Sequence, residues 1–165
     1  MADLSPMPID ADMSGAGIRV RTLATAGQWI VTGSDLLPNT IDAGPPARVW
    51  LAPDRCLVVA ETVTASPDEY FVSDVTDGFV IFDINGVNAT ALLAMASPLD
   101  PAVLAPGSCA QTLFAGVKVI VYPHGDGLRL HVERALVEWL IAWIARALTS
   151  FGTQMPDPTD TPRHG

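Results

Sequence analysis

The chain has 165 residues, of which 49% are hydrophobic and 16% are charged, and its formal net charge is −9. This length suits one domain with a substantial core, and the small share of charged residues indicates either a tightly packed monomer or apolar surface that a partner covers. An acidic chain without a cluster of Lys or Arg repels phosphate backbones, which excludes nucleic-acid binding.

The sequence divides into three segments. Residues 1–16 have no apolar period and are predicted to be a flexible N-terminal arm, residues 17–151 form a single domain, and residues 152–165 form a disordered tail. The first residues carry neither the basic stretch nor the apolar run of a secretory signal. With only Cys56 and Cys109 as cysteines, we expect a cytoplasmic protein with two reduced thiols.

The first half of the domain is predicted to consist of strands. Residues 18–23 alternate apolar and polar side chains, which is the period of a half-buried strand, and residues 28–32 continue as a second strand. After a passage rich in Gly and Pro, residues 48–60 are typical of a hairpin that turns at residues 52–55.

The second half of the domain mixes strands and helices. Residues 71–76 and 79–84 are predicted to form a second hairpin, because Asp77-Gly78 suits a tight turn with positive φ. Further elements are expected at 86–96 (helix), 111–115, 117–122 and 128–132 (strands) and 134–151 (helix). This order predicts an α+β fold with an antiparallel or mixed sheet and helices on one face.

The closing helix has an apolar arc roughly 200° wide, about twice what an ordinary surface helix needs. Glu138 and Arg146 exclude a membrane span. The arc is either one broad core face or a core face with an interface along its flank, and tryptophan is enriched at interfaces. We therefore single out Trp139 and Trp143 as candidate partner-interface residues.

No pattern in the chain specifies a reaction. His124 and His131 have no second ligand at metal spacing, and Cys109 lacks a neighbouring base that would lower its pKa. The glycines match neither a dinucleotide-binding nor a phosphate loop. We assign no catalytic, cofactor-binding or metal-binding residue.

The polar cluster at residues 74–78 has two interpretations. It is either a turn whose Asp and Thr side chains satisfy themselves, or a contact in which Asp74 or Asp77 meets a cationic residue of a partner chain. Asp74 and Asp77 are accordingly the other two candidate interface residues.

Several segments keep a family's order and spacing over residues 47–148. They are the strand–turn–strand at 49–59, the Asp74-Val-Thr-Asp-Gly78 cluster, a Gly86-led helix ending in Leu92-Leu93, Pro98-Leu99-Asp100, Pro106-Gly-Ser-Cys-Ala-Gln-Thr112 and the tryptophan-bearing closing helix. Together these segments resemble the gamma subunit of heterotetrameric sarcosine oxidase. The segment at residues 106–112 is the most specific of them.

The resemblance implies a fold like the folate-binding aminomethyltransferase domain, built from ferredoxin-like halves. The first half looks truncated in this chain. Where the family has helices, only residues 34–39 and the short stretch 66–70 stand. We expect either that the sheet face left without helical cover needs a partner, or that the chain is a divergent paralogue.

The resemblance also implies a heterotetramer with alpha, beta and delta subunits. FAD, FMN, NAD, tetrahydrofolate and zinc would lie on those other chains, and the complex would carry out oxidative N-demethylation of sarcosine or a related secondary amine in one-carbon metabolism. This chain would be a non-catalytic gamma subunit with an assembly role in an oxidoreductase acting on CH–NH donors. Alternatives are the equivalent subunit of an N-methylglutamate dehydrogenase and a free-standing folate-binding one-carbon protein.

Overall fold

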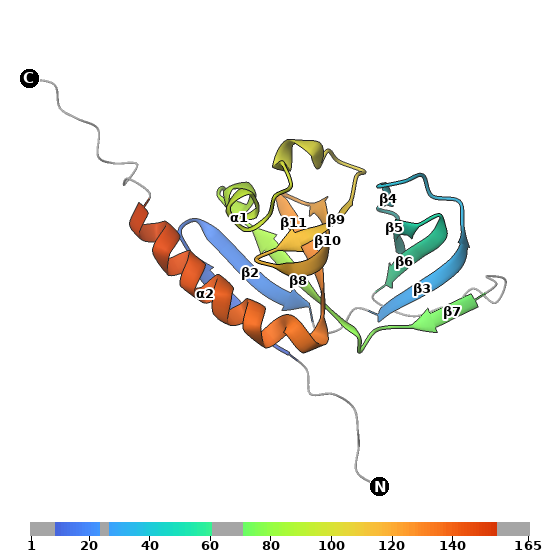
Figure 1. Ribbon diagram of the computed structural model, residues 1–165, viewed down its shortest axis with the longest axis horizontal. Helices are drawn as coiled ribbons and strands as arrows, with labels where there is room; N and C mark the ends of the chain where they lie inside the picture. The colour runs from blue at the N-terminus through green and yellow to red at the C-terminus, as the bar shows by residue number, and fades with distance from the viewer. Residues whose placement is uncertain (1–8, 24–26, 61–70, 155–165) are drawn as a thin grey trace, which may run out of the picture.

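The computed structural model describes residues 9–23, 27–60 and 71–154. These residues form two sheets and two α-helices in three layers, with the helices on one face of the larger sheet and the smaller sheet on its other face (Figure 1). The α+β class predicted from the sequence is confirmed. Among the described residues, no helix is both long and apolar enough to cross a membrane.

The larger sheet has six strands in the order β1–β2–β8–β11–β10–β9, and every neighbouring pair is antiparallel. Its strands are β1 (Asp12–Gly15), β2 (Ile18–Leu23), β8 (Phe79–Asn85), β9 (Ala110–Phe114), β10 (Val117–His124) and β11 (Gly127–Glu133). The predicted meander of the second half is confirmed as β9, β10 and β11, which are consecutive in both chain and sheet.

The smaller sheet has five antiparallel strands in the order β4–β5–β6–β3–β7. Its strands are β3 (Gly27–Ser34), β4 (Ile41–Asp42), β5 (Ala47–Ala52), β6 (Asp54–Ala60) and β7 (Phe71–Asp74). The hairpin predicted for residues 48–60 is confirmed as β5 and β6. Residues 27–60 contain no helix, so this part of the first half consists of strands and loops, as the sequence indicates.

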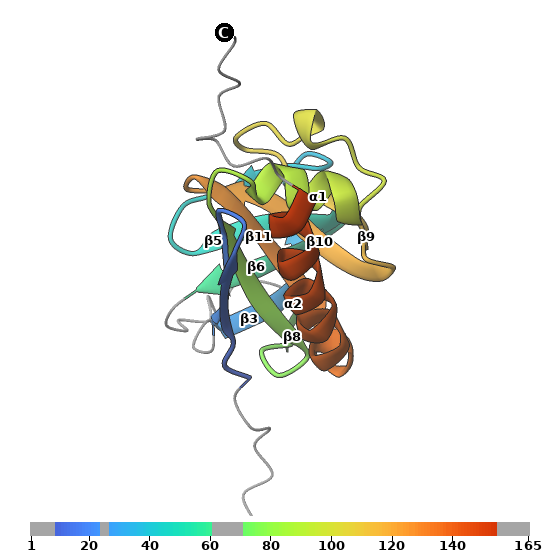
Figure 2. The same cartoon turned by 90° about the vertical axis from the view of Figure 1, so that its left-hand side faces the viewer.

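Both helices pack on the same face of the larger sheet, as predicted (Figure 2). They are α1 (Ala89–Ala96) and α2 (Val137–Gln154). The short 3-10 turn η1 (Pro101–Val103) follows α1, and the 3-10 turn η2 (Arg134–Leu136) directly precedes α2. The side chains that α2 buries are Val137, Leu140, Ile144, Ala147 and Leu148. Burying the Val, Leu and Ile side chains of this set against the strands contributes about 1.5–3 kcal/mol each and fixes the helix on the sheet.

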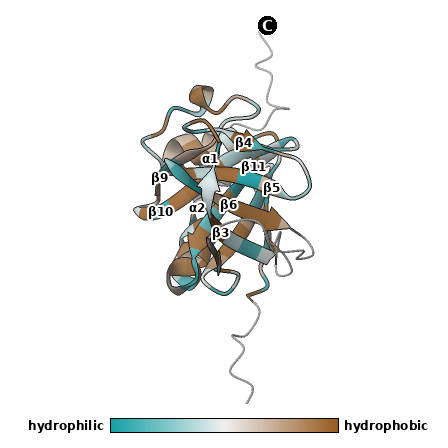
Figure 3. Ribbon diagram, turned by 90° about the vertical axis from the view of Figure 1, so that its right-hand side faces the viewer, coloured by the Kyte–Doolittle hydropathy of each residue, from teal (hydrophilic) through white to brown (hydrophobic). Residues whose placement is uncertain are grey.

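A second core fills the space between the two sheets. Ile81, Ile120 and Tyr122 of the larger sheet are buried against Val49 and Leu57 of the smaller one. Figure 3 views the molecule from the side of the smaller sheet and shows polar and apolar segments alternating along its strands. The face that we expected to need a partner is therefore partly covered by the chain's own second sheet.

A buried hydrogen-bonded bridge crosses this second core. His131 of β11 is fully buried, and its Nε2 lies 2.9 Å from the Tyr122 hydroxyl while its Nδ1 lies 2.7 Å from Oε1 of Gln28 in β3. The Gln28 amide in turn donates to the Phe79 carbonyl at 3.1 Å. Because every buried polar group here has a partner, the bridge fixes how one sheet lies on the other.

The segment at residues 106–112 forms a second connection between the sheets. The Gly107 carbonyl accepts from Ile41 N–H at 3.0 Å, and Cys109 N–H donates to the Asn39 carbonyl at 2.9 Å. Further along, the Gln111 side chain donates to the Leu51 carbonyl at 2.6 Å. The most specific motif of the sequence thus has a structural role, because it joins β9 of one sheet to the loops and strands of the other.

The hairpin predicted for residues 71–84 is wrong. β7 pairs with β3 in the smaller sheet and β8 pairs with β2 and β11 in the larger sheet, so the intervening residues carry the chain from one sheet to the other. Gly78 is also not among the residues with positive φ. The Thr76 hydroxyl accepts from Gln28 N–H at 3.0 Å, and this contact between distant residues replaces the expected strand pairing.

The flexible arm predicted for residues 1–16 is too long, because β1 lies within it. β1 pairs with β2, and Ile9 and Met13 pack against the helix-side core. Four residues are too few for their alternation to stand out in the sequence. The tail predicted for residues 152–165 begins too early, because α2 extends to Gln154. Residues 1–8, the rest of the tail from 155 onward and the expected helical stretch at 66–70 lie outside the described residues.

Candidate subunit interface

The turn between β7 and β8 carries two of the four predicted interface residues. Asp74 is exposed, and its Oδ1 accepts from Thr76 N–H at 2.9 Å. Hydrogen bonds from the Thr76 side chain and backbone hold the pKa of the Asp74 carboxyl below its usual value. Asp74 therefore stabilises its own turn, which agrees with the first of our two interpretations, and its carboxylate stays ionised.

Asp77 lies where this turn meets the start of the closing helix. Its backbone carbonyl accepts from Arg134 Nε at 2.7 Å, and the neighbouring Gly78 carbonyl accepts from Arg134 N–H at 2.9 Å. The side chain of Asp77 is exposed. Arg134 thus holds the backbone of the turn against η2.

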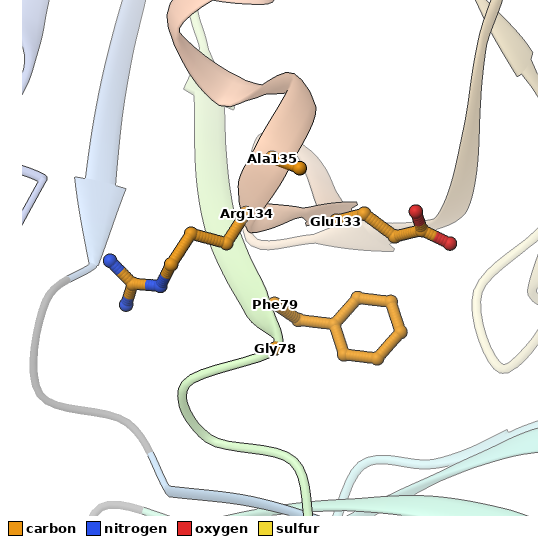
Figure 4. A pocket seen from close by; sticks show the side chains of 5 residues that line it. All are labelled: Gly78, Phe79, Glu133, Arg134 and Ala135. Atoms are coloured by element: carbon orange, nitrogen blue, oxygen red, sulfur yellow. The ribbon is translucent and has the colours of Figure 1, made fainter. Parts of the chain in front are cut away.

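An open hollow of about 580 Å³ lies at this junction. It is lined by Gly78, Phe79, Glu133, Arg134 and Ala135. In Figure 4 the Phe79 ring and the Glu133 carboxylate project to the same side, whereas the Arg134 guanidinium projects to the opposite side. The hollow can accept an apolar side chain against the ring, with a carboxylate at its edge.

The two predicted tryptophans have different environments. Trp139 is 48% exposed and Leu136, three residues earlier, is 37% exposed, so both offer apolar surface just after the lining residues Glu133, Arg134 and Ala135 in the chain. Trp143 is half-buried and packs edge-on against Phe114 of β9, with ring centroids 5.8 Å apart. In this chain Trp143 is thus partly a core residue, and Trp139 is the tryptophan whose ring is available to a partner.

We call the hollow together with Asp77, Leu136 and Trp139 the junction patch. Our sequence analysis singled out Asp77 and Trp139 but missed Phe79, Glu133 and Arg134. No local signal could have found them, because the Arg134–Asp77 contact spans 57 residues of sequence. An exposed tryptophan four residues after the lining residue Ala135, together with an apolar hollow that has a charged rim, is the composition of an interface centre.

The nucleophilic and titratable side chains of the inter-sheet core are engaged in the structure of the chain. Burial lowers the pKa of His131 to about 3, with the positive charge of Arg129 adding to the effect. Cys109 is buried and donates to the Thr40 carbonyl at 3.3 Å, and burial raises the pKa of its thiol, the opposite of what a nucleophile needs. In the part of the chain that the structure describes, no three His, Cys, Asp or Glu side chains are grouped as metal ligands would be.

Comparison with known proteins shows the fold. No protein-family model and no curated protein matches the chain. A chain of the heterotetrameric sarcosine oxidase from Corynebacterium sp. U-96, solved in complex with pyrrole 2-carboxylate, superposes with a TM-score of 0.74 at 17% identity. The match covers 88% of this chain and 90% of the other. The protein therefore has the α+β fold of a chain found in that heterotetrameric oxidase.

Proposed function

We propose that the chain is the gamma-type subunit of a heterotetrameric, sarcosine-oxidase-like flavoenzyme, with a structural role in its assembly. The observation that carries this proposal is the near-complete, two-way coverage of the superposed oxidase chain. Because both chains are covered almost equally, they have nearly the same length and the likeness extends over the whole domain. A shared fold alone does not define function, so the proposal also rests on the motif at residues 106–112 and on the junction patch.

The proposed division of labour places the chemistry on partner subunits. These would be an alpha, a flavin-bearing beta and a small zinc-binding delta subunit, holding FAD, FMN, NAD, tetrahydrofolate and zinc. Their reaction would remove two electrons from the N–CH₃ group of sarcosine or a related secondary amine. Water would then release the one-carbon unit as formaldehyde and leave the primary amine, while the flavin takes the electrons.

The proposal is tested by measuring the amine-oxidising activity of the complex that co-purifies with this chain. The chain is tagged in its native source and purified under mild conditions, and the eluate is assayed for sarcosine-dependent formaldehyde release with a redox dye as electron acceptor. We expect activity in the eluate, and activity with N-methylglutamate alone would assign the chain to the dehydrogenase instead. An eluate that turns over neither amine contradicts the proposal.

Replacing Trp139 by aspartate is expected to abolish assembly without unfolding the chain. A half-exposed side chain contributes little to the folded monomer, so its unfolding free energy should change by less than about 1 kcal/mol. A charge at the centre of an apolar contact costs several-fold more than that in binding. Yield of co-purified partner chains, compared by quantitative mass spectrometry, should fall at least about tenfold.

The control for this variant is Leu37→Asp, which introduces the same charge at another exposed apolar residue, in the loop after β3. It should co-purify the same partners as the wild-type chain. Trp143 is not a suitable site, because its contact with Phe114 means that a substitution there also disturbs the core. Equal co-purification by the Trp139 and Leu37 variants would place the interface elsewhere.

A further inference from the structure

A row of polar side chains crosses four strands of the larger sheet, beside the inter-sheet core. In the strand register Arg21 of β2 stands opposite Asp83 of β8, Asp83 stands opposite Arg129 of β11, and Arg129 stands opposite Tyr122 of β10. Residues opposite one another point to the same face of a sheet. The adjacent row consists of Leu23, Ile81, His131 and Ile120 and lies in the inter-sheet region. The arginines therefore lie where cover by the smaller sheet ends.

Asp83 is the single carboxylate shared by the two arginines of this row. Its side chain is 7% exposed and accepts from Arg21 Nη2 at 3.0 Å, from Asn85 Nδ2 at 3.0 Å and from Arg129 Nε at 3.4 Å. Burial opposes ionisation of this carboxyl, but the bonds from Asn85 and Arg21 and the charge of Arg129 outweigh it, so its pKa lies below the usual value. Asp83 is charged and already accepts three hydrogen bonds.

The arginines retain hydrogen-bonding capacity that Asp83 does not use. A guanidinium has five N–H donors, and each of these two gives one nitrogen to Asp83. Arg21 Nε is buried and has no hydrogen-bond partner. The side chains of Arg21 and Arg129 are still 43% and 23% exposed, so a group approaching from outside can reach their exposed parts but not the buried Nε of Arg21.

The charge of this surface is opposite to that of the chain. Arg19 lies two residues before Arg21 on the same face of β2 and pairs with Asp12 at 2.6 Å. Three arginines then stand against two carboxylates, Asp12 and Asp83, which leaves an excess positive charge in a chain whose net charge is −9. A local surplus of one sign attracts a partner of the other and sets its orientation.

We propose that Arg19, Arg21 and Arg129, the arginine row, form a docking surface for an acidic, extended segment of a neighbouring polypeptide. Carboxylates two residues apart in an extended segment are about 7 Å apart, the same spacing as Arg19 and Arg21 along β2. One of them can accept from the terminal Nη groups of Arg21, whose side chain is 43% exposed. We assign the acidic segment to a partner subunit. Only this assignment rests on the proposed function.

The test uses the full-length chain and a defined probe. The peptide acetyl-Gly-Glu-Gly-Glu-Gly-amide is titrated at low ionic strength, because salt screens exposed charges, and the Nε–Hε resonances of the arginines are followed by NMR. We expect a saturable shift of the Arg21 resonance with this peptide and none with the Gln-for-Glu peptide. Absence of the shift in the wild-type chain overturns the proposal, whatever the variants do.

Two variants with equal charge change locate the binding. Arg21→Gln with Arg129→Gln should weaken the peptide at least about tenfold, because charge-assisted hydrogen bonds are lost. The control variant, Arg48→Gln with Arg146→Gln, removes the same amount of charge at positions outside the arginine row. Among the described residues, Arg48 forms an ion pair with Asp35 alone. This control should bind the peptide like the wild type. Equal weakening in both would mean a general charge effect and would contradict the proposal. The subunit proposal is tested separately, by whether an amine-oxidising complex co-purifies with the tagged chain.

Discussion

Replacing Gly86 by alanine is expected to lower the free energy of unfolding by about 3 kcal/mol or more. Gly86 links β8 to α1 with φ at +118°, a conformation that residues with a side chain rarely adopt. A Cβ at this position would also clash with the Gly17 carbonyl oxygen in the turn between β1 and β2. The substitution therefore strains its own backbone and pushes the link between β8 and α1 away from the turn between β1 and β2.

A matched variant separates these two costs. Gly116, in the turn between β9 and β10, has φ at +82°, but a Cβ there would meet nothing within 4 Å. Gly116→Ala should therefore cost only the conformational part, about 1 kcal/mol. Denaturant unfolding of the two variants measures both values. Equal losses would show that the approach of Gly86 to Gly17 is not tight.

Acidification is expected to destabilise the fold through His131. Burial, with the charge of Arg129 adding to it, lowers the pKa of this imidazole to about 3, whereas an unfolded chain has a value near 6.5. Between these values the unfolded state binds a proton that the folded state does not, so stability falls as the pH falls from about 6.5 towards 3. The slope approaches about 1.4 kcal/mol per pH unit.

The unfolding free energy should be about 2 kcal/mol lower at about pH 5 than at about pH 7.5. His131→Asn should be less stable at both pH values, because Tyr122 and Gln28 lose their partner, yet should show little of this difference. His124→Asn, which changes an exposed histidine, should retain most of it. A wild-type chain equally stable at both pH values would contradict a neutral, buried His131.

The class of fold could be predicted from the sequence because it depends on local periodicity. β2 shows the apolar–polar alternation of a strand, the meander from β9 to β11 shows short apolar runs separated by turns, and the apolar arc of α2 requires a sheet to cover it. The split into two sheets could not be predicted. Asp77-Gly78 is typical of a hairpin, but the contact of Thr76 with Gln28, 48 residues away, directs the chain into the other sheet.

The candidate sites also include some that could be predicted from the sequence and some that could not. Trp139 could be found because an over-wide apolar arc is visible in the helix itself, and the structure leaves its ring half exposed. Trp143 lies one helical turn after Trp139, on the same side of the helix. Its contact with Phe114 could not be predicted, because it depends on tertiary packing. The arginine row was missed altogether, because Arg21 and Arg129 lie 62 and 46 residues from Asp83 and meet it only through strand register.

The most direct measurement of the central claim is the native mass and visible spectrum of the particle that contains this chain. The tagged chain is isolated from its native source, and the intact particle is weighed by native mass spectrometry and then dissociated. The subunit account predicts one copy of this chain with larger, different chains and a flavin absorbance. A colourless chain that travels alone would contradict it, and tetrahydrofolate binding by that solitary chain would favour the free-standing folate-binding alternative.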